Sequence, residues 1–399
     1  MTKRREFLQY CRPAIDDDDA QAVAETLRRG WLTTGPGAIE FERSFAHAAG
    51  MRHAVALNSC TAGLHLSLLA AGVGPGDEVI VPALSFVAGA NCIRQVGAKP
   101  VFCDVEASSL CLSVDTIAAR LTPATRAVMT MHYAGRPASA ARIAALCRSR
   151  GIAMIEDAAL AVGTLDDGEW SGTRSDAAVY SFYATKNVTT AEGGMLVTND
   201  DGFAERVRVL ALHGMDKDAW KRYERGGSWR YDIVATGYKY NMPDTAAVLG
   251  IRQLRKLEAN QRRREAIAQR YLESFETIPG VTGADLGSMG PRDTHSWCMF
   301  PISVDESAAG ISRDDAVVAL GERNIGTSVH YIPSHFFSSY RDAADVKLPV
   351  TEREWLKLIS LPLYPGMTDD DVDDVIDALR DCVPAARVVR SGGRRAGNG

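Results

Sequence analysis

Residues 53–103 read HAVALNSCTAGLHLSLLAAGVGPGDEVIVPALSFVAGANCIRQVGAKPVFC, and this stretch sets the pattern of the fold. A short apolar run at 53–57 precedes a helical pattern that ends at Gly72, and a turn then leads into a second apolar run that ends at residue 82. Strands that alternate with helices of this length predict an α/β fold with a mostly parallel sheet covered by helices on both faces. Further strands are expected at 99–105, 126–133, 152–158, 177–183 and 193–199, and further helices at 86–97, 114–121 and 141–151.

The pattern changes after residue 237. Residues 244–275 read as one long helix, and the following segments mix strands (295–304, 325–331) with helices (312–324, 369–383) in the manner of a small α+β domain. We therefore predict a large domain over residues 1–245 that includes an N-terminal arm, a smaller C-terminal domain over 246–388, and a disordered Gly- and Arg-rich tail over 389–399.

Composition excludes several classes of protein. The chain has 399 residues, 45 Lys and Arg against 50 Asp and Glu, a net charge of -5 and 46% apolar residues. Mild acidity without a basic block argues against a nucleic-acid or anionic-membrane partner, and no apolar run is long enough to predict a membrane span. The basic N-terminus lacks the apolar core of a secretory signal, and the eight cysteines form no C-x-x-C pair. Reduced thiols and a cytoplasmic location are the expectation.

Lys186 is the first candidate for chemistry. It lies in SFYATKNVTTAEGGM, just after an apolar strand and among Ser, Thr, Asn and Gly residues. A lone lysine in a loop is most often a surface residue. Partial removal from water at the end of a buried strand, however, would favour the neutral amine, which is a nucleophile that forms Schiff bases.

Asp157 is the matching acid. Glu156 and Asp157 close a strand that reads as fully buried, where an acid is otherwise a helix cap or a turn residue. Pyridoxal phosphate needs a carboxylate against its ring nitrogen, because the protonated ring withdraws electrons during the reaction. A lysine for the aldehyde and an aspartate for the ring nitrogen, both at strand ends, form a coherent pair.

A phosphate site is expected at residues 58–63, NSCTAG, which lie between a strand and a helix. Free amide groups and hydroxyls at a helix N-terminus favour a phosphate dianion, although an N-cap without a ligand is common. Ser181 offers a further hydroxyl, and Phe86 follows the next strand and offers a ring that stacks on a flat cofactor.

Together these segments resemble the fold-type-I pyridoxal phosphate enzymes of the DegT/StrS sugar aminotransferase family, from about residue 7 to residue 385. Within the family the chain is most similar to the branch that aminates UDP-4-keto-pentose. The shared strings are WLTTGPGAIEFE, NSCTAGLHLSL, GDEVIVPALSFVA, GAKPVFCDV, MIEDAA, SFYATKNVTTAEGGM and GYKYNMPDTAAVLGIRQL, and those of the branch are GYKYNM, HYAGRPA, ISRDD, NIGTSVHY and LPLYPGMT.

The resemblance implies roles for the cofactor-binding residues. Lys186 would bind the cofactor covalently and later move a proton, Asp157 would pair with the pyridinium nitrogen, and Phe86 would stack on the ring. The phosphate would be bound by Cys60, Thr61 and Ser181.

The resemblance also implies a homodimer with shared active sites, because Asn241 would reach the phosphate in the neighbouring subunit. The substrates would be glutamate, as amino donor, and a nucleotide-linked keto sugar. Residues near the sugar-nucleotide entrance would be Tyr10, Thr34, Gly35, His330 and Tyr331.

Leu160 departs from the family pattern. The family usually has Gln or His there, contacting the phenolic oxygen of the cofactor, and a leucine cannot make a hydrogen bond. Retention of Lys186 argues against the branch that carries His instead and performs dehydration. His330 and His335 lack a carboxylate at ligand spacing, so no metal site is predicted.

Three functions remain open from the sequence. The first is transamination of a nucleotide-linked keto sugar, from UDP-4-keto-pentose-like to dTDP- or GDP-keto-deoxysugars. The second is a pyridoxal phosphate enzyme of natural-product biosynthesis that acts on a cyclitol, an amino acid or another intermediate without a nucleotide, with Leu160 marking a changed reaction. The third is a cofactor-binding regulator without turnover, against which the lack of a DNA-binding module argues.

Overall fold

The computed structural model describes residues 4–216, 230–284, 289–343 and 345–383, so the predicted tail at 389–399 lies outside the described residues. A seven-stranded sheet dominates the structure, in the order β1-β9-β8-β5-β4-β2-β3. Neighbouring strands pair in parallel except around β9, which runs antiparallel to both β1 and β8. The strands are β1 (His53–Leu57), β2 (Glu78–Pro82), β3 (Lys99–Cys103), β4 (Thr125–Met131), β5 (Ala153–Asp157), β8 (Ala177–Ser181) and β9 (Gly194–Thr198).

Helices cover both faces of this sheet, as the alternating pattern predicts. On one face α3 (Cys60–Ala70), α4 (Ala88–Gln95) and α7 (Asp201–Ala211) bury apolar side chains against the sheet residues Val79, Ile155 and Val179. On the other face lie α2 (Pro36–Ala49), α5 (Val114–Ala118) and α6 (Ala140–Arg150). The central strands are therefore enclosed on both sides, which explains their nearly continuous apolar sequences.

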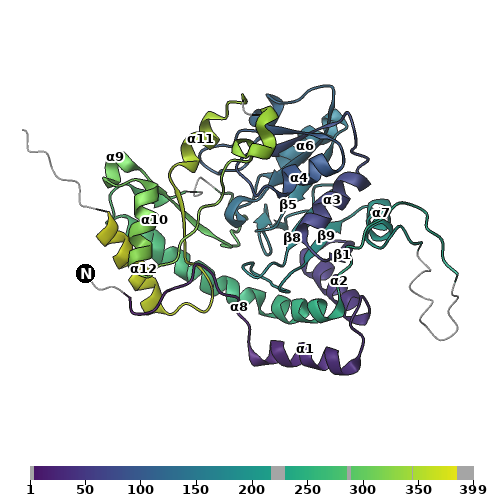
Figure 1. Cartoon of the computed structure of the whole chain (residues 1–399), viewed down its shortest axis with the longest axis horizontal. Coiled ribbons are helices and arrows are strands. Elements are labelled where there is room, and N and C mark those ends of the chain that lie inside the picture. The colour runs from purple at the N-terminus through teal and green to yellow at the C-terminus, as the bar shows by residue number, and fades with distance from the viewer. Residues whose placement is uncertain (1–3, 217–229, 285–288, 344, 384–399) are drawn as a thin grey trace, which may run out of the picture.

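The helix α8 (Asp244–Phe275) has the bounds expected from the sequence and connects two hydrophobic cores. Figure 1 shows it running from beside α2 to the C-terminal helices. Ala247 and Leu257 pack with the α2 side of the large sheet, whereas Ile267 and Tyr271 pack with a smaller core. The division of the chain after residue 245 stays a prediction.

The smaller core surrounds an antiparallel sheet of β10 (Val281–Gly283), β11 (Phe300–Val304) and β12 (Leu358–Leu361). Of the three strands, only β11 falls within a predicted one (295–304), whereas α10 (Arg313–Glu322) and α12 (Asp369–Cys382) match the helices predicted at 312–324 and 369–383. Besides these, the described residues form α1 (Asp17–Arg29), β6 (Leu165–Asp166), β7 (Glu169–Trp170), α9 (Glu306–Ala309), α11 (Pro349–Trp355) and short 3-10 helices at Tyr133–Gly135, Ser334–Phe336 and Ser338–Ala343.

The strand predicted at 325–331 is wrong. This segment makes only isolated bridges, from Ile325 to Leu8 and from Ser328 to Ser360. Its β-branched residues suit a strand, but it runs between the N-terminal segment and β12 without a continuous partner for a hydrogen-bond ladder. Within the described residues no helix is both long enough and apolar enough to cross a membrane.

Candidate active site

The residues predicted to bind the cofactor and to act in catalysis lie at the carboxyl ends of the parallel strands, apart from Asn241. Asp157 is the last residue of β5, and Ser181 is the last residue of β8, five residues before Lys186. Phe86 follows β2, and Cys60 begins α3 shortly after β1 ends. This edge is where open α/β sheets bind ligands, because the loops and helix N-termini that follow the strands meet there.

Asp157 presents a buried carboxylate to this edge. Its side chain is 6% exposed, its Oδ1 accepts a hydrogen bond from the Ala159 N–H at 3.0 Å, and the Cys60 Sγ lies 4.0 Å from the same oxygen. Burial raises the pKa of Asp157, while the Ala159 N–H and the Lys186 charge act in the opposite direction. A cation against this carboxylate would offset the free-energy cost of burying its charge.

Lys186 lies on a turn that is anchored from both sides. Its backbone N–H donates to the Tyr183 carbonyl at 2.9 Å, and the next side chain, Asn187, donates to the Ser296 carbonyl at 2.7 Å. Burial is the main influence on the pKa values of Asp157, Cys60 and His330, and the Lys186 ammonium is a further influence on each. The charge of Lys186 thus acts on groups from three separate segments.

An anion cradle forms where α3 begins. Ser59 caps the helix, accepting the Ala62 N–H on its Oγ at 3.1 Å, while Cys60 and Thr61 have N–H groups that no helix carbonyl can accept. Ser181 pairs across the sheet with Gly194, and a Cβ added at Gly194 would lie 2.5 Å from the Cys60 nitrogen. The glycine therefore permits the close approach that brings Ser181 to the start of α3.

Aromatic side chains form one wall of the site. The ring of Phe86 is 58% exposed and lies 6.1 Å from that of Tyr331. The His330 ring lies 4.9 Å from that of Tyr331 and 5.4 Å from that of Tyr10, and its Nδ1 is 2.8 Å from the Ser360 Oγ. Burial, with a contribution from Lys186, lowers the pKa of His330 to about 4, so the imidazole is neutral at pH 7.

Thr34, Gly35 and Asn241 form a separate group. The Asn241 Nδ2 donates to the Thr34 Oγ1 at 2.6 Å, and the Gly35 N–H donates to the carboxylate of Asp244 at 2.8 Å. In the described part of this one chain, no hydrogen bond, ion pair or ring contact joins these three residues to Lys186. Asn241 instead pairs with Leu57, the last residue of β1, so this group adjoins the segment at 58–63 without bonding to Lys186 in the described part of the chain.

Leu160 lies in an apolar environment. It is 2% exposed and belongs to a cluster with Tyr133, Cys298 and Met299, against which Tyr331 packs. Only its backbone carbonyl is engaged, accepting a hydrogen bond from the Ser296 Oγ at 2.6 Å. The side chain at this position fills the core and offers no polar group to a ligand.

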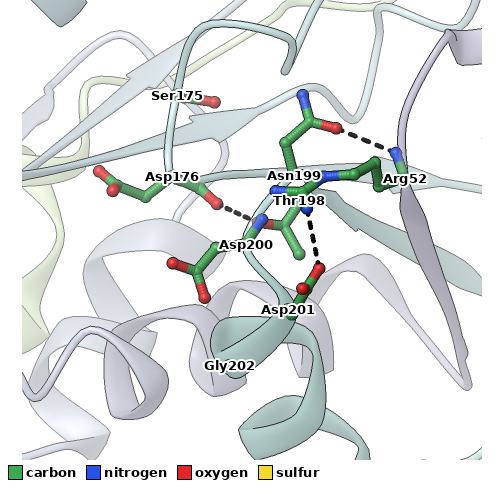
Figure 2. Close-up of a pocket in the computed structure, with 8 residues that line it drawn as sticks. All are labelled: Arg52, Ser175, Asp176, Thr198, Asn199, Asp200, Asp201 and Gly202. Atoms are coloured by element: carbon green, nitrogen blue, oxygen red, sulfur yellow. Dashed lines mark hydrogen bonds and ion pairs between the residues drawn. The ribbon is translucent and has the colours of Figure 1, made fainter.

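A pocket of about 440 Å³ lies at the opposite edge of the sheet (Figure 2). In it the Arg52 side chain reaches Asp201, and the Thr198 hydroxyl donates to the Asp176 carbonyl. Because Thr198 pairs with His53, the first residue of β1, this pocket is remote from the carboxyl edge. No cluster of His, Cys, Asp or Glu suited to a metal occurs among the described residues.

A sequence model of the DegT/DnrJ/EryC1/StrS aminotransferase family matches residues 13–380. The chain belongs to this family. It is 46% identical over 388 residues to the Bacillus subtilis spore coat polysaccharide biosynthesis protein SpsC, covering 96% of this chain and 99% of SpsC.

Solved structures of aminotransferases share the whole fold. The putative sugar aminotransferase Spr1654 of Streptococcus pneumoniae, in its PLP-form, superposes with a TM-score of 0.85 at 29% identity, covering 94% of this chain and 98% of Spr1654. DesI in the presence of its TDP-sugar product gives a TM-score of 0.84 at 33% identity, covering 95% and 93% of the two chains.

As a member of the DegT/DnrJ/EryC1/StrS family, the protein is an aminotransferase with an amino donor and a keto acceptor as substrates, and its cofactor is pyridoxal 5′-phosphate. The predicted fold type, enzyme class and cofactor are confirmed. The residues present fit this cofactor: a buried carboxylate lies near a lysine, and the glycine at 194 leaves room beside two free N–H groups at the start of α3. The fit rests on features of this chain as well as on its relatives.

Sequence reasoning missed residues that hold the family site in place. Asn187 fixes the turn of Lys186 through a 3.3 Å hydrogen bond to Gln261 as well as its bond to Ser296. Ser360, from β12, joins His330 to the small sheet. Asn187 could have been suspected from the sequence, because it directly follows Lys186. Ser360 could not, because it lies 30 residues from His330 and nothing near it in the sequence indicates a role in the site.

Proposed function

We propose that the protein transfers an amino group from glutamate to the keto carbon of a nucleotide-linked sugar, of the UDP-4-keto-pentose or dTDP- or GDP-keto-deoxysugar type. The observation that carries the proposal is the buried carboxylate of Asp157 at the end of β5, with Lys186 just after the neighbouring strand β8 and its charge acting on that carboxylate. Two relatives support the acceptor: SpsC is described as a spore coat polysaccharide biosynthesis protein, and DesI was solved with a TDP-sugar product.

Lys186 and Asp157 have different roles in the proposed reaction. The bound cofactor supplies an electron sink that makes a C–H bond beside the nitrogen acidic. Lys186 would hold the cofactor through its Nζ, and its amine would serve as the base that moves the proton at the substrate carbon. Asp157 holds a proton on the ring nitrogen with its charged carboxylate, and the 6% exposure of the residue keeps water from weakening that contact.

The remaining residues bind and orient. Cys60, Thr61 and Ser181 hold the phosphate through N–H groups and a hydroxyl, and Phe86 stacks on the ring. Tyr10, His330 and Tyr331 line the acceptor side. A nucleotide bound away from the reacting carbon would orient the sugar, because binding free energy from remote groups offsets the entropy lost on positioning.

Half-reactions test this function directly. With bound cofactor and L-glutamate alone, we expect about one 2-oxoglutarate per active site, as in any exchange that proceeds by alternating half-reactions. Adding a UDP- or dTDP-linked keto sugar should then yield the amino sugar nucleotide, detected by mass spectrometry. The same keto sugar without its nucleotide is the matched control and should have a much lower kcat/KM.

Two results would contradict the proposal. A protein that retains its cofactor but releases no 2-oxoglutarate from glutamate would exclude glutamate as donor. Equal kcat/KM for the free keto compound would favour the alternative, an enzyme acting on a cyclitol or another intermediate without a nucleotide, and Leu160 would then be the first residue to exchange.

The proposal includes a homodimer in which Asn241, with Thr34 and Gly35, serves the active site of the partner. In its own chain Asn241 is hydrogen-bonded to Thr34 rather than to the residues around Lys186, which supports this arrangement. A two-fold axis would place the group of each subunit at the site of the other.

Mixed dimers test the shared site. Lys186→Ala and Asn241→Ala proteins should each have strongly reduced activity, and random re-association should restore about a quarter of the sites, since only one site of each heterodimer receives both intact residues. Mixing Lys186→Ala with itself is the control. Activity of the mixture equal to the mean of the two variants would show that Asn241 acts within its own chain.

A further inference from the structure

A pair of ionisable side chains is buried beneath the site, and the proposed chemistry does not use it. His132 directly follows β4, Glu156 lies in the neighbouring strand β5, and the His132 Nε2 is 2.6 Å from the Glu156 Oε2. Both side chains are fully buried. Burying ionisable groups is costly, and apolar residues of the same volume often stabilise a fold as well, so the pair needs a reason beyond stability.

All polar atoms of the two side chains have hydrogen-bond partners, and these partners indicate which ring nitrogen of His132 carries the hydrogen. The Ala138 N–H donates to the His132 Nδ1 at 3.1 Å, so that nitrogen carries a lone pair and Nε2 carries the hydrogen that is donated to Glu156. The second carboxylate oxygen of Glu156 accepts the Gly172 N–H at 3.1 Å. The His132 ring and the Glu156 carboxyl group therefore join the ends of two strands and two loops.

The same two residues adjoin Asp157. Glu156 precedes it in β5, and the backbone N–H of His132 donates to the carbonyl oxygen of Asp157 at 3.3 Å. Since side chains alternate along a strand, Glu156 points to the face opposite Asp157. The strand end that carries Asp157 is thus held from behind by Glu156 and from the side by His132.

We propose that His132 and Glu156 are positioning residues that fix the carboxylate of Asp157 against the ring nitrogen of the cofactor. The inference rests on the proposed role of Asp157. The carboxylate of Asp157 accepts the Ala159 N–H from its own loop, and the Cys60 Sγ lies 4.0 Å from the same oxygen, so the direction of the carboxylate depends mainly on where the β5 backbone is held. A displacement of about 1 Å is enough to lose much of a charge-assisted contact.

The test compares cofactor release from folded holoprotein. His132→Leu removes the donor to Glu156, and Glu156→Gln leaves one acceptor oxygen for two N–H donors. We expect each to speed release of pyridoxal phosphate by about ten-fold or more, the size usual for residues that orient a primary ligand. The visible circular dichroism of the bound cofactor should change as well, because it reports the placement of the ring, which mere loss of fold stability would not alter.

Two further variants separate an effect on the position of Asp157 from a general loss of fold stability. Glu42→Gln is the control, because Glu42 also joins a backbone N–H, that of Ala56 at 2.9 Å, to a basic residue, Arg208 at 2.9 Å, away from the site. It should lower the melting temperature without changing release or dichroism. His132→Gln, whose amide can still donate to Glu156, should recover part of the retention.

The outcomes separate this inference from the proposed function. Wild-type release and dichroism in both His132→Leu and Glu156→Gln, together with fast release in Asp157→Asn, would overturn the positioning role and leave the role of Asp157 intact. Wild-type release in Asp157→Asn would overturn both. If His132→Leu does not fold, Glu156→Gln alone decides by the same two measurements.

Discussion

Lys186→Ala protein should lose at least about 10³-fold in kcat, because the change removes both the nucleophile that binds the cofactor and the base that carries the proton. The fold should remain, since the Lys186 turn is held by its own backbone N–H and by Asn187. Turnover of the variant is measured with glutamate and the acceptor. In a second measurement, wild-type holoprotein is reduced with borohydride and its peptides are analysed by mass spectrometry. Reduction should attach the cofactor to the peptide that contains Lys186.

Lys186→Arg is the matched variant for charge. A guanidinium keeps the positive charge near Asp157 and Cys60 but does not form a Schiff base, so this protein should be as inactive as Lys186→Ala. Substantial turnover by either variant, or labelling of a different lysine after reduction, would contradict the assignment.

Asp157→Asn should weaken cofactor binding by roughly 100- to 1,000-fold. The amide retains an oxygen for the Ala159 N–H but removes the charge that faces the ring nitrogen, and breaking a buried ion pair costs about 3–5 kcal/mol. Because burial already raises the pKa of Asp157, the free carboxylate is poorly solvated and gains most from a cationic partner. Equilibrium titration of apoprotein with pyridoxal phosphate measures the loss.

Asp166→Asn provides the comparison. Asp166 is 8% exposed and accepts the Ala140 N–H at 2.6 Å, so the same change removes a buried carboxylate charge that acts on His132 and Glu156 but, within the described residues, makes no hydrogen bond or ion pair with Asp157. It should affect the melting temperature but leave cofactor affinity within about two-fold of wild type, as expected for residues that share no contact. Equal losses of affinity in both variants would mean that Asp157 acts only through the stability of the fold.

The local part of the fold is predictable because each element carries its own signal. Residues 53–57 and 153–157 are apolar runs of strand length, and residues 244–275 keep a helical period throughout, so the corresponding elements appear where expected. The grouping of Lys186, Asp157 and Cys60 also follows from sequence, since residues just after parallel strands meet at one edge.

Pairing between distant segments is less predictable. Nothing local indicates that β9 inserts antiparallel between β1 and β8, or that His132 lies beside Glu156, because both depend on which strands become neighbours. The strand expected at 325–331 does not form for the same reason. Its composition suits a strand, but neighbouring segments pair with it only through isolated β-bridges. For Phe86 and Asn241 the proposed roles come from the family resemblance and not from local patterns. The role of Phe86 depends on a bound cofactor, and that of Asn241 depends on a second subunit.

The length of α8 links the site to the far end of the molecule. Its 32 residues span about 48 Å as one uninterrupted rod, with Ala247 near one end in the larger core and Tyr271 near the other in the smaller one. Opening of either core would strain a helix that also packs in the other core, so we expect the two cores to open to hydrogen exchange as one cooperative unit. We therefore expect ligand binding beside Lys186 to slow the exchange of amide hydrogens in β10, β11 and β12 as well.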